Sequence, residues 1–286
     1  MYKSLFLSPK KLPNVFTTEN NETPMPTAAG LYYFFHQADD SSSLPLILIH
    51  GAGGTHLHWP PDLRRLNGFQ IASLDLPGHG KSEGIGRQTI TEYVQVLQEF
   101  MDAINLPAAI IVGHSMGSAI ALQMALNTPE RVLALILVGS GSRLRVAPSI
   151  LENTASEATF PLAVKTINDW AFGPDTSERL KELAARRMGE TRPTVLHGDF
   201  IACNEFDVGE RLAEIKLPTL IICGSEDKLT PPKYSKLLHE NILHSEHVNI
   251  ERAGHMVMLE KPHAVVDAIE SFIESSNLSP SHISAH

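Results

Sequence analysis

The chain has 286 residues, of which 43% are hydrophobic and 19% are charged. This length and composition predict one large globular domain, or one domain with an insertion, and exclude a disordered chain. Lysine and arginine number 23 and aspartate and glutamate 32, which gives a formal net charge of −9. Because clustered cations are needed to bind phosphates, we expect the chain to bind neither nucleic acid nor an anionic membrane surface.

Cysteine usage and apolar runs narrow the class further. The two cysteines, Cys203 and Cys223, exclude a disulfide framework and a thiolate metal cluster, and each is expected to be a small core residue. No apolar run reaches the roughly 18 residues of a membrane helix. The N-terminal residues lack the apolar stretch and cleavage site of a signal peptide. We therefore expect a cytoplasmic protein.

Short apolar runs alternate with helical patterns along most of the chain. The runs are rich in Ile, Leu and Val and are bounded by Gly or Pro, which is typical of strands buried on both faces of a parallel sheet. Helical patterns such as 90–104 and 118–127 separate them. The alternation predicts an α/β fold, with a mostly parallel central sheet and helices on both faces. The six predicted strands are residues 45–49, 69–74, 108–112, 132–138, 219–223 and 247–250.

One region interrupts this alternation and predicts an inserted helical cap. Between residues 141 and 212 no buried strand is indicated, and the patterns at 163–170, 177–187 and 194–204 are helical. An insertion at the C-terminal edge of such a sheet lies over its ligand crevice. The predicted parts of the chain are an extended lead-in (1–27), an α/β core (28–140 and 213–274), the cap (141–212) and a flexible tail (275–286).

The strongest motif is Gly113-His114-Ser115-Met116-Gly117, of the form G-x-S-x-G. It follows a predicted strand and precedes a predicted helix. A serine on such a turn has an exposed hydroxyl and a strained backbone, and the flanking glycines let the turn close. The helix N-terminus that follows favours developing negative charge. Ser115 is therefore the candidate nucleophile.

A serine nucleophile needs a base, and the base needs a carboxylate to orient it. Asp227 follows the predicted strand 219–223, and His255 follows the next apolar run, so both fall at the sheet edge that carries Ser115. The order Ser, Asp, His is the one used with a nucleophile elbow. Glu226 competes for the acid role, but along an extended segment its side chain points away from that of Asp227. We favour Asp227.

The glycine-rich loop after the strand 45–49 has two interpretations. A dinucleotide-binding G-x-G-x-x-G motif fails because position 56 is His56. The better interpretation is a loop that offers a backbone N–H to an oxyanion, with the amides of Ala52 and Met116 as the two donors. Gly53 is an alternative to Ala52, and the sequence leaves that choice open.

Other polar residues near the same edge are expected to be structural. His50, His79 and His114 each flank a glycine, and their spacing fits no short zinc motif. Asp75 precedes a Pro-Gly turn, where it is expected to cap backbone amides rather than act as the acid. We expect no metal site and no cofactor.

Together these motifs resemble the α/β-hydrolase superfamily, in its large group of single-domain enzymes with a helical cap. The resemblance implies Ser115 as nucleophile, His255 as general base and Asp227 as its partner. Haloalkane- and epoxide-cleaving members carry Asp in place of the serine, so those reactions are not expected. The resemblance extends from about residue 44 to residue 273, and its matching stretches are 50–53, 75–82, 113–117, 224–227 and 254–255.

The predicted function is hydrolysis of small to medium, uncharged carboxylic esters through an acyl-serine, by a monomer or small homo-oligomer. Arg143 and Arg145 are expected to be solvated charges, with binding of a substrate carboxylate as the alternative. The rival functions are C–C bond hydrolysis of dienoic acids, lactone hydrolysis, a perhydrolase or haloperoxidase side activity, and a ligand receptor. The cap residues expected to form its apolar face and an apolar pocket are Leu144, Val146, Ile150, Phe160, Leu162, Trp170, Phe172, Leu196, Phe200 and Phe206.

Overall fold

The computed structural model describes residues 26–37, 43–276 and 278. Its central element is an eight-stranded sheet in the order β1-β2-β4-β3-β5-β6-β7-β8. The β1–β2 and β2–β4 pairs are antiparallel and all the others are parallel. The predicted fold class is confirmed. The strands are β1 (Thr27–Ala28), β2 (Leu31–His36), β3 (Leu44–Ile49), β4 (Phe69–Leu74), β5 (Ala109–His114), β6 (Val132–Val138), β7 (Thr219–Gly224) and β8 (Ser245–Ile250).

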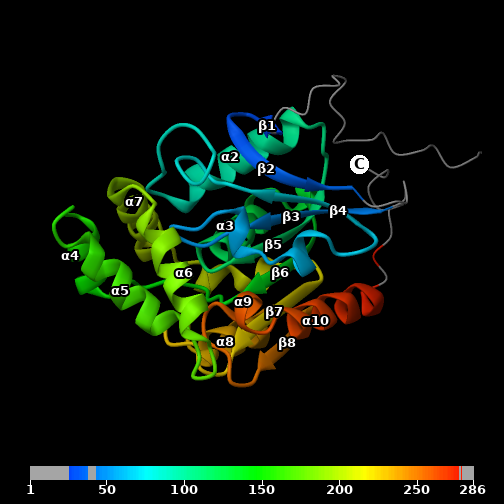
Figure 1. Ribbon diagram of the computed structural model, residues 1–286. Helices are drawn as coiled ribbons and strands as arrows, with labels where there is room; N and C mark the ends of the chain where they lie inside the picture. The colour runs from blue at the N-terminus through cyan, green and yellow to red at the C-terminus, as the bar shows by residue number, and fades with distance from the viewer. Residues whose placement is uncertain (1–25, 38–42, 277, 279–286) are drawn as a thin grey trace, which may run out of the picture.

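Helices cover both faces of the sheet and form a separate group at one side of it (Figure 1). Among the described residues, no helix is long and apolar enough to cross a bilayer. The helices are α1 (Pro61–Arg64), α2 (Ile90–Ala103), α3 (Met116–Asn127), α4 (Pro148–Thr154), α5 (Phe160–Ala171), α6 (Glu178–Gly189), α7 (Pro193–Glu205), α8 (Pro232–Asn241), α9 (Val257–Glu260) and α10 (Pro262–Ser275).

Alternating side chains of the central strands fill two hydrophobic cores. Ile47 and Ile49 of β3 join the core that contains α2, α3 and part of α8. Leu46 and Leu48 point the other way, into the core that contains α1, α9 and α10. Burying apolar residues on both faces stabilises β3 through both cores and explains its unbroken Leu/Ile sequence.

Two strands differ from the sequence prediction. Strand β8 was expected to be buried on both faces, but it is the edge strand, and only Ile250 within it is buried. Strand β2 was not predicted. Its first three residues are buried and its last three partly buried, so it lacks the polar alternation that marks a half-exposed strand. Its antiparallel pairing to β4 covers the edge of the parallel strands that lies opposite β8.

Helices α4 to α7 form the cap and lie between β6 and β7 in the chain (Figure 1). Three correspond to the predicted helical segments, whereas α4, only seven residues long and starting at Pro148, was missed. The cap has its own apolar cluster, which includes Ile150, Phe160 and Leu196. Most of the predicted lead-in and tail lies outside the described residues, although Thr27 belongs to β1 and Ser275 to α10.

The topology places a crevice beside β3. This strand lies between β4, which follows it in the chain, and β5. Loops that leave β3 and β5 at their carboxyl ends therefore turn toward opposite faces of the sheet, and ligands bind in the gap that this leaves. The glycine-rich loop follows β3 and the G-x-S-x-G turn follows β5, so both border the crevice.

Candidate active site

The turn from β5 to α3 holds Ser115 in a strained conformation. Its φ of 54° and ψ of −115° lie outside the regions that L-residues ordinarily adopt. The two glycines of the motif make the turn possible. A Cβ on Gly113 would lie 2.2 Å from the Gly117 carbonyl oxygen, and one on Gly117 would lie 2.3 Å from the Ile49 carbonyl oxygen. Strand, turn and helix thus approach too closely for any side chain, which leaves the Ser115 side chain at the crevice.

His255 and Asp227 are brought together from the loops that follow β8 and β7. The Nδ1 of His255 donates to Oδ2 of Asp227 at 2.8 Å. Both side chains are buried. Glu226 is exposed and makes no such contact, so the carboxylate facing the histidine is the one that the sequence favoured. Among the described residues, Nε2 of His255 makes no hydrogen bond, and His255 lines the same cavity as Ser115.

The Asp227 carboxylate is held by more than His255. Its Oδ1 accepts hydrogen bonds from the amides of Leu229 at 2.9 Å and Thr230 at 2.8 Å. Its Oδ2 also accepts from the Thr230 hydroxyl at 2.7 Å, and that hydroxyl lies 3.1 Å from Nδ1 of His255. Burial alone would raise the pKa of Asp227, but the charge of His255 and these hydrogen bonds outweigh it and lower the pKa. The carboxylate therefore stays ionised beside the imidazole.

His114, next to Ser115, anchors the loop that carries His255. Its Nε2 donates to the His255 carbonyl oxygen at 3.0 Å, and the two rings lie 4.7 Å apart. Burial, together with the neighbouring His255 and His58, holds the pKa of His114 well below its usual value. His114 is thus a neutral hydrogen-bond donor, as the sequence predicted for it.

His50 and Asp75 are structural residues, again as predicted. The Nδ1 of His50 donates to the Gly51 carbonyl oxygen at 2.7 Å, and its Nε2 accepts from the Leu76 amide at 3.0 Å. Asp75 accepts hydrogen bonds from the amides of His56 and Lys81, at 2.6 and 2.9 Å. It is fully buried and makes no contact with His255 among the described residues. Asp75 therefore holds the loops together.

His79 differs from the other two histidines because it carries a charge. Its Nδ1 donates to the Pro77 carbonyl oxygen at 3.1 Å and its Nε2 to Asp199 at 2.9 Å. Burial opposes protonation, but the Asp199 carboxylate and the two hydrogen bonds outweigh it and raise the pKa of His79. His79 and Asp199 form a buried pair distinct from that of His255 and Asp227, and His56 forms a third with Asp75 at 2.8 Å.

The two candidate amides of the glycine-rich loop, those of Ala52 and Gly53, have different surroundings. The Gly53 amide donates to Oδ2 of Asp199 at 2.9 Å, so it is already engaged. Ala52 lines the same cavity as Ser115. Met116 is the first residue of α3, where a backbone amide has no intrahelical acceptor. Of the two amides between which the sequence left the choice open, that of Gly53 is bound by Asp199.

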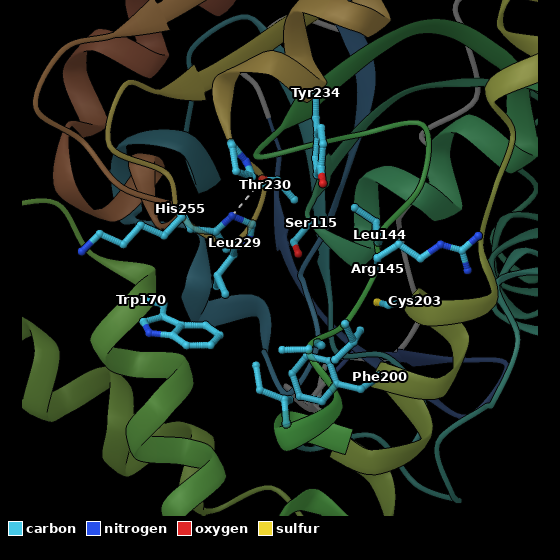
Figure 2. A pocket seen from close by; sticks show the side chains of 16 residues that line it. Ser115, Leu144, Arg145, Trp170, Phe200, Cys203, Leu229, Thr230, Tyr234 and His255 are labelled. Atoms are coloured by element: carbon cyan, nitrogen blue, oxygen red, sulfur yellow. Dashed lines mark hydrogen bonds between the residues drawn. The ribbon is translucent and has the colours of Figure 1, made fainter. Parts of the chain in front are cut away.

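A cavity of about 360 Å³ connects these groups, and the cap forms much of its wall. Figure 2 shows Ser115 at its centre, with His255 and Leu229 on one side and Leu144 and Cys203 opposite. Side chains from the core line the rest, including Lys228 and Tyr234. Most of the lining groups are apolar, which suits the hydrocarbon part of a small ligand.

The cap residues named from the sequence divide into two groups. Five of the ten line the cavity: Leu144, Val146, Ile150, Trp170 and Phe200. The other five pack within the cap or onto the core, or lie at the surface: Phe160, Leu162, Phe172, Leu196 and Phe206.

The two arginines of the cap region are exposed, as predicted. Arg145 reaches the cavity wall, but it turns its guanidinium away from Ser115 (Figure 2) and donates to the Asn204 carbonyl oxygen at 2.7 Å. Arg143 lies 3.9 Å from Asp207.

Sequence reasoning missed Thr230 and Asp199. Thr230 stands three residues after Asp227, a spacing at which an aspartate commonly accepts hydrogen bonds from the following turn. Asp199 was visible as the one acidic residue in the predicted helix 194–204. Neither signal identifies the partners, which come from distant parts of the chain.

The chain belongs to the α/β-hydrolase fold family, whose family model matches residues 45–262. The match covers the strands from β3 to β8, and with them every loop that contributes to the crevice. It also includes the whole of the cap.

Similar proteins include an esterase and a lactonase. A pimeloyl-[acyl-carrier protein] methyl ester esterase of Pectobacterium carotovorum is 28% identical over 263 residues, covering 86% of this chain and 100% of that protein. The 3-oxoadipate enol-lactonase 1 of Acinetobacter baylyi is 25% identical over 247 residues, covering 84% of this chain and 92% of that protein. The solved structure of a thermophilic esterase, 35% identical, has a TM-score of 0.72 over 86% of this chain and 98% of its own.

Replacing Gly113 by alanine tests the close packing at the elbow. Gly113→Ala is expected to destabilise the protein by about 3 kcal/mol, because the new methyl group overlaps the backbone of α3. The matched control is Gly189→Ala, where no heavy atom lies within 4 Å of the added Cβ. That change is expected to stay within about 0.5 kcal/mol. Urea unfolding measures both, and equal stabilities of the two variants would contradict the steric account.

The charge on His79 predicts a pH-dependent stability. A histidine whose pKa is raised on folding stabilises the folded state. That contribution is complete below the pKa of the unfolded chain, near 6.5, and is lost as the pH rises through the raised pKa of the folded state. The free-energy difference between the protein and its His79→Gln variant should therefore narrow as the pH rises above about 6.5 and through the raised pKa of His79. The exposed His263→Gln change is the control. A difference that does not vary over this range is inconsistent with a charged His79.

Proposed function

We propose that the protein is a serine hydrolase that cleaves carboxylic esters through an acyl-serine intermediate. The observation that carries the proposal is the meeting of three features in one cavity. These are a serine on a strained elbow, a histidine paired with a buried carboxylate whose pKa is lowered, and Ala52 of the opposite loop, which lines the same cavity as the serine. Acyl transfer needs a nucleophile, a base and an oxyanion site, and this cavity supplies a candidate for each.

In the proposed reaction, Ser115 Oγ attacks the ester carbonyl carbon while Nε2 of His255 takes its proton. Asp227 holds the imidazole with its Nδ1 protonated and stabilises the imidazolium that forms. His255 then gives the proton to the leaving alcohol. A water molecule, deprotonated by the same histidine, attacks the acyl-serine and releases the acid. No step in this sequence requires a cofactor.

The oxyanion of the tetrahedral intermediate is proposed to accept hydrogen bonds from the amides of Ala52 and Met116. They come from the loops after β3 and β5, neighbouring strands of the sheet. The N-terminus of α3 adds a favourable electrostatic potential at the same place. Loss of one such donor costs about 2.7–4 kcal/mol in a comparable enzyme.

The cavity supports small to medium acyl groups without charge. Its volume of about 360 Å³ and mostly apolar lining favour a hydrocarbon chain. Lactone hydrolysis is the second candidate, because an enol-lactonase is among the similar proteins and a lactone is opened by the same steps. The substrate is thus proposed to be a small neutral ester or lactone. The monomeric or small homo-oligomeric state and the cytoplasmic location expected from the sequence belong to the same proposal.

Initial rates on p-nitrophenyl esters from acetate to palmitate test the reaction. A maximum at short or medium chains is expected, and Ser115→Ala should lower turnover by about 10⁴-fold or more while the protein stays folded. Ester hydrolysis that survives in Ser115→Ala would remove this serine from the mechanism. If every ester is inert but a fluorophosphonate labels Ser115, C–C bond hydrolysis or ligand binding replaces esterolysis as the proposal.

Phe200→Ala tests the cap as the wall of the acyl pocket. Removing the phenyl ring enlarges the cavity, so the rate constant kcat/KM for the longest esters should rise by about tenfold relative to acetate. Leu162→Ala is the matched control, because Leu162 is a cap residue with 53% of its surface exposed. An unchanged chain-length profile in Phe200→Ala contradicts this role for the cap.

A further inference from the structure

Asp199 is a carboxylate buried where the cap meets the core. It lies on α7, and it has no exposed surface. Val195 and Cys203, one turn before and after it, are buried too. A charged group in such surroundings destabilises the fold unless it is paired and fully hydrogen-bonded. Its partners therefore indicate what the residue does.

All the partners of Asp199 come from the core. The Tyr93 hydroxyl of α2 donates to Oδ1 at 2.5 Å. Oδ2 accepts from Nε2 of His79 at 2.9 Å and from the Gly53 amide at 2.9 Å. The imidazolium of His79 balances the charge, and the tyrosine, buried as well, keeps its proton because burial raises its pKa. Only the third partner, Gly53, belongs to the loop beside the nucleophile.

The loop around Gly53 is a tight turn, and the contact with Asp199 engages its central peptide. The Gly54 amide donates to the Gly51 carbonyl oxygen at 3.0 Å, which closes the turn. The φ of Gly53 is 63°, whereas the φ of Ala52 is not positive. This combination at the two central residues is typical of a type II turn. Rotating the peptide between Ala52 and Gly53 would convert the turn to type I and swing the Gly53 N–H away from Asp199.

A second contact from the cap holds the other polar group of Gly53. The Thr191 hydroxyl, between α6 and α7, donates to the Gly53 carbonyl oxygen at 3.1 Å. Thr191 is buried. Both backbone groups of Gly53 are therefore bound by the cap, whereas the carbonyl oxygen of Gly51, at the start of the turn, accepts from Nδ1 of His50 in the core.

We propose that Asp199 is a positioning residue that fixes the turn presenting the Ala52 amide to the oxyanion. The cap then contributes to transition-state stabilisation as well as to the shape of the cavity that holds the acyl chain. The inference rests on the proposed ester hydrolysis. Asp199 does not line the cavity, whereas Ala52 does, so Asp199 acts through the loop and not by touching the substrate.

The expected effect is a loss in kcat with little change in KM. Removing an oxyanion donor lowers kcat by about 10²–10³-fold, and displacing one without removing it should lower kcat by about 10- to 100-fold. Binding of the ground-state acyl chain depends on the apolar cavity wall, which does not contain Asp199. KM is therefore expected to stay within about threefold.

The test compares three variants on the best p-nitrophenyl ester. Asp199→Ala removes the acceptor for Gly53. Asp199→Asn keeps one oxygen that can accept from Gly53 and should recover most of kcat. Asp175→Ala is the control, because Asp175 is another cap-region carboxylate bound to a core side chain, Arg252, but it makes no contact with the turn. Thermal unfolding establishes that each variant is folded at the assay temperature.

A trifluoromethyl ketone carrying the same acyl chain reports on the oxyanion directly. Ser115 Oγ adds to its carbonyl carbon, the serine proton moves to His255, and the carbonyl oxygen becomes a stable oxyanion. Its affinity should fall in Asp199→Ala by the same factor as kcat, and stay unchanged in Asp175→Ala. If Asp199→Ala does not fold, Thr191→Val replaces it, and both quantities should fall together by about threefold to tenfold.

Parallel losses of kcat and inhibitor affinity, with recovery in Asp199→Asn, support the positioning role. Equal losses in Asp199→Ala and Asp175→Ala overturn it, because they indicate general loosening of the cap. Unchanged kinetics in Asp199→Ala also overturn it, and leave ester hydrolysis standing if Ser115→Ala is inactive. Full hydrolysis by Ser115→Ala instead removes the proposed function itself, and the oxyanion role of Asp199 with it.

Discussion

The close approach of three backbone segments around Ser115 is the constraint on which the site depends. Strand β5, helix α3 and the end of β3 meet at Gly113 and Gly117, with no room for a Cβ at either position. Packing of this kind compensates the cost of the positive φ at Ser115, which is of order 1–3 kcal/mol. It also sets the distance between the elbow and the glycine-rich loop. A looser turn would separate the nucleophile from the Ala52 amide.

Two of the three buried His–Asp pairs in the described part of the chain organise the surroundings of this turn, and the third, His56 with Asp75, joins the loops after β3 and β4. His255 and Asp227 face the cavity, whereas His79 and Asp199 join the loops of the core to the cap. Each carboxylate is fully supplied with donors, which is the condition under which a buried charge is tolerated. The pairs differ in access: His255 lines the cavity and has one nitrogen edge left for it, but both nitrogens of His79 are bound to protein acceptors. Of these two pairs, the first borders the cavity that contains Ser115.

The fold and the candidate residues could be predicted because both depend on short-range sequence patterns. Apolar runs bounded by glycine marked β3 to β7, and the placement of Ser115, Asp227 and His255 after strand ends put them at one edge. Their position at the same edge also predicted that Asp227 and His255 lie close together. Patterns failed where exposure depends on neighbours distant in the chain. The sequence of residues 245–250 does not indicate that β8 pairs with a strand on one side only. The buried start of β2 likewise depends on its pairing with β4 and on packing against α2.

The sequence by itself determined the class of fold, the elbow and the order of its chemical groups, because backbone geometry and hydrophobic periodicity are local properties. The tertiary structure alone decided which amide of the glycine-rich loop bonds to Asp199, which cap residues face the cavity and why α7 carries a buried acid. Gly53 and Asp199 are 146 residues apart, and their hydrogen bond exists only once the cap has docked. Long-range contacts of this kind leave no periodic signal, since they depend on how separately folded segments pack against one another.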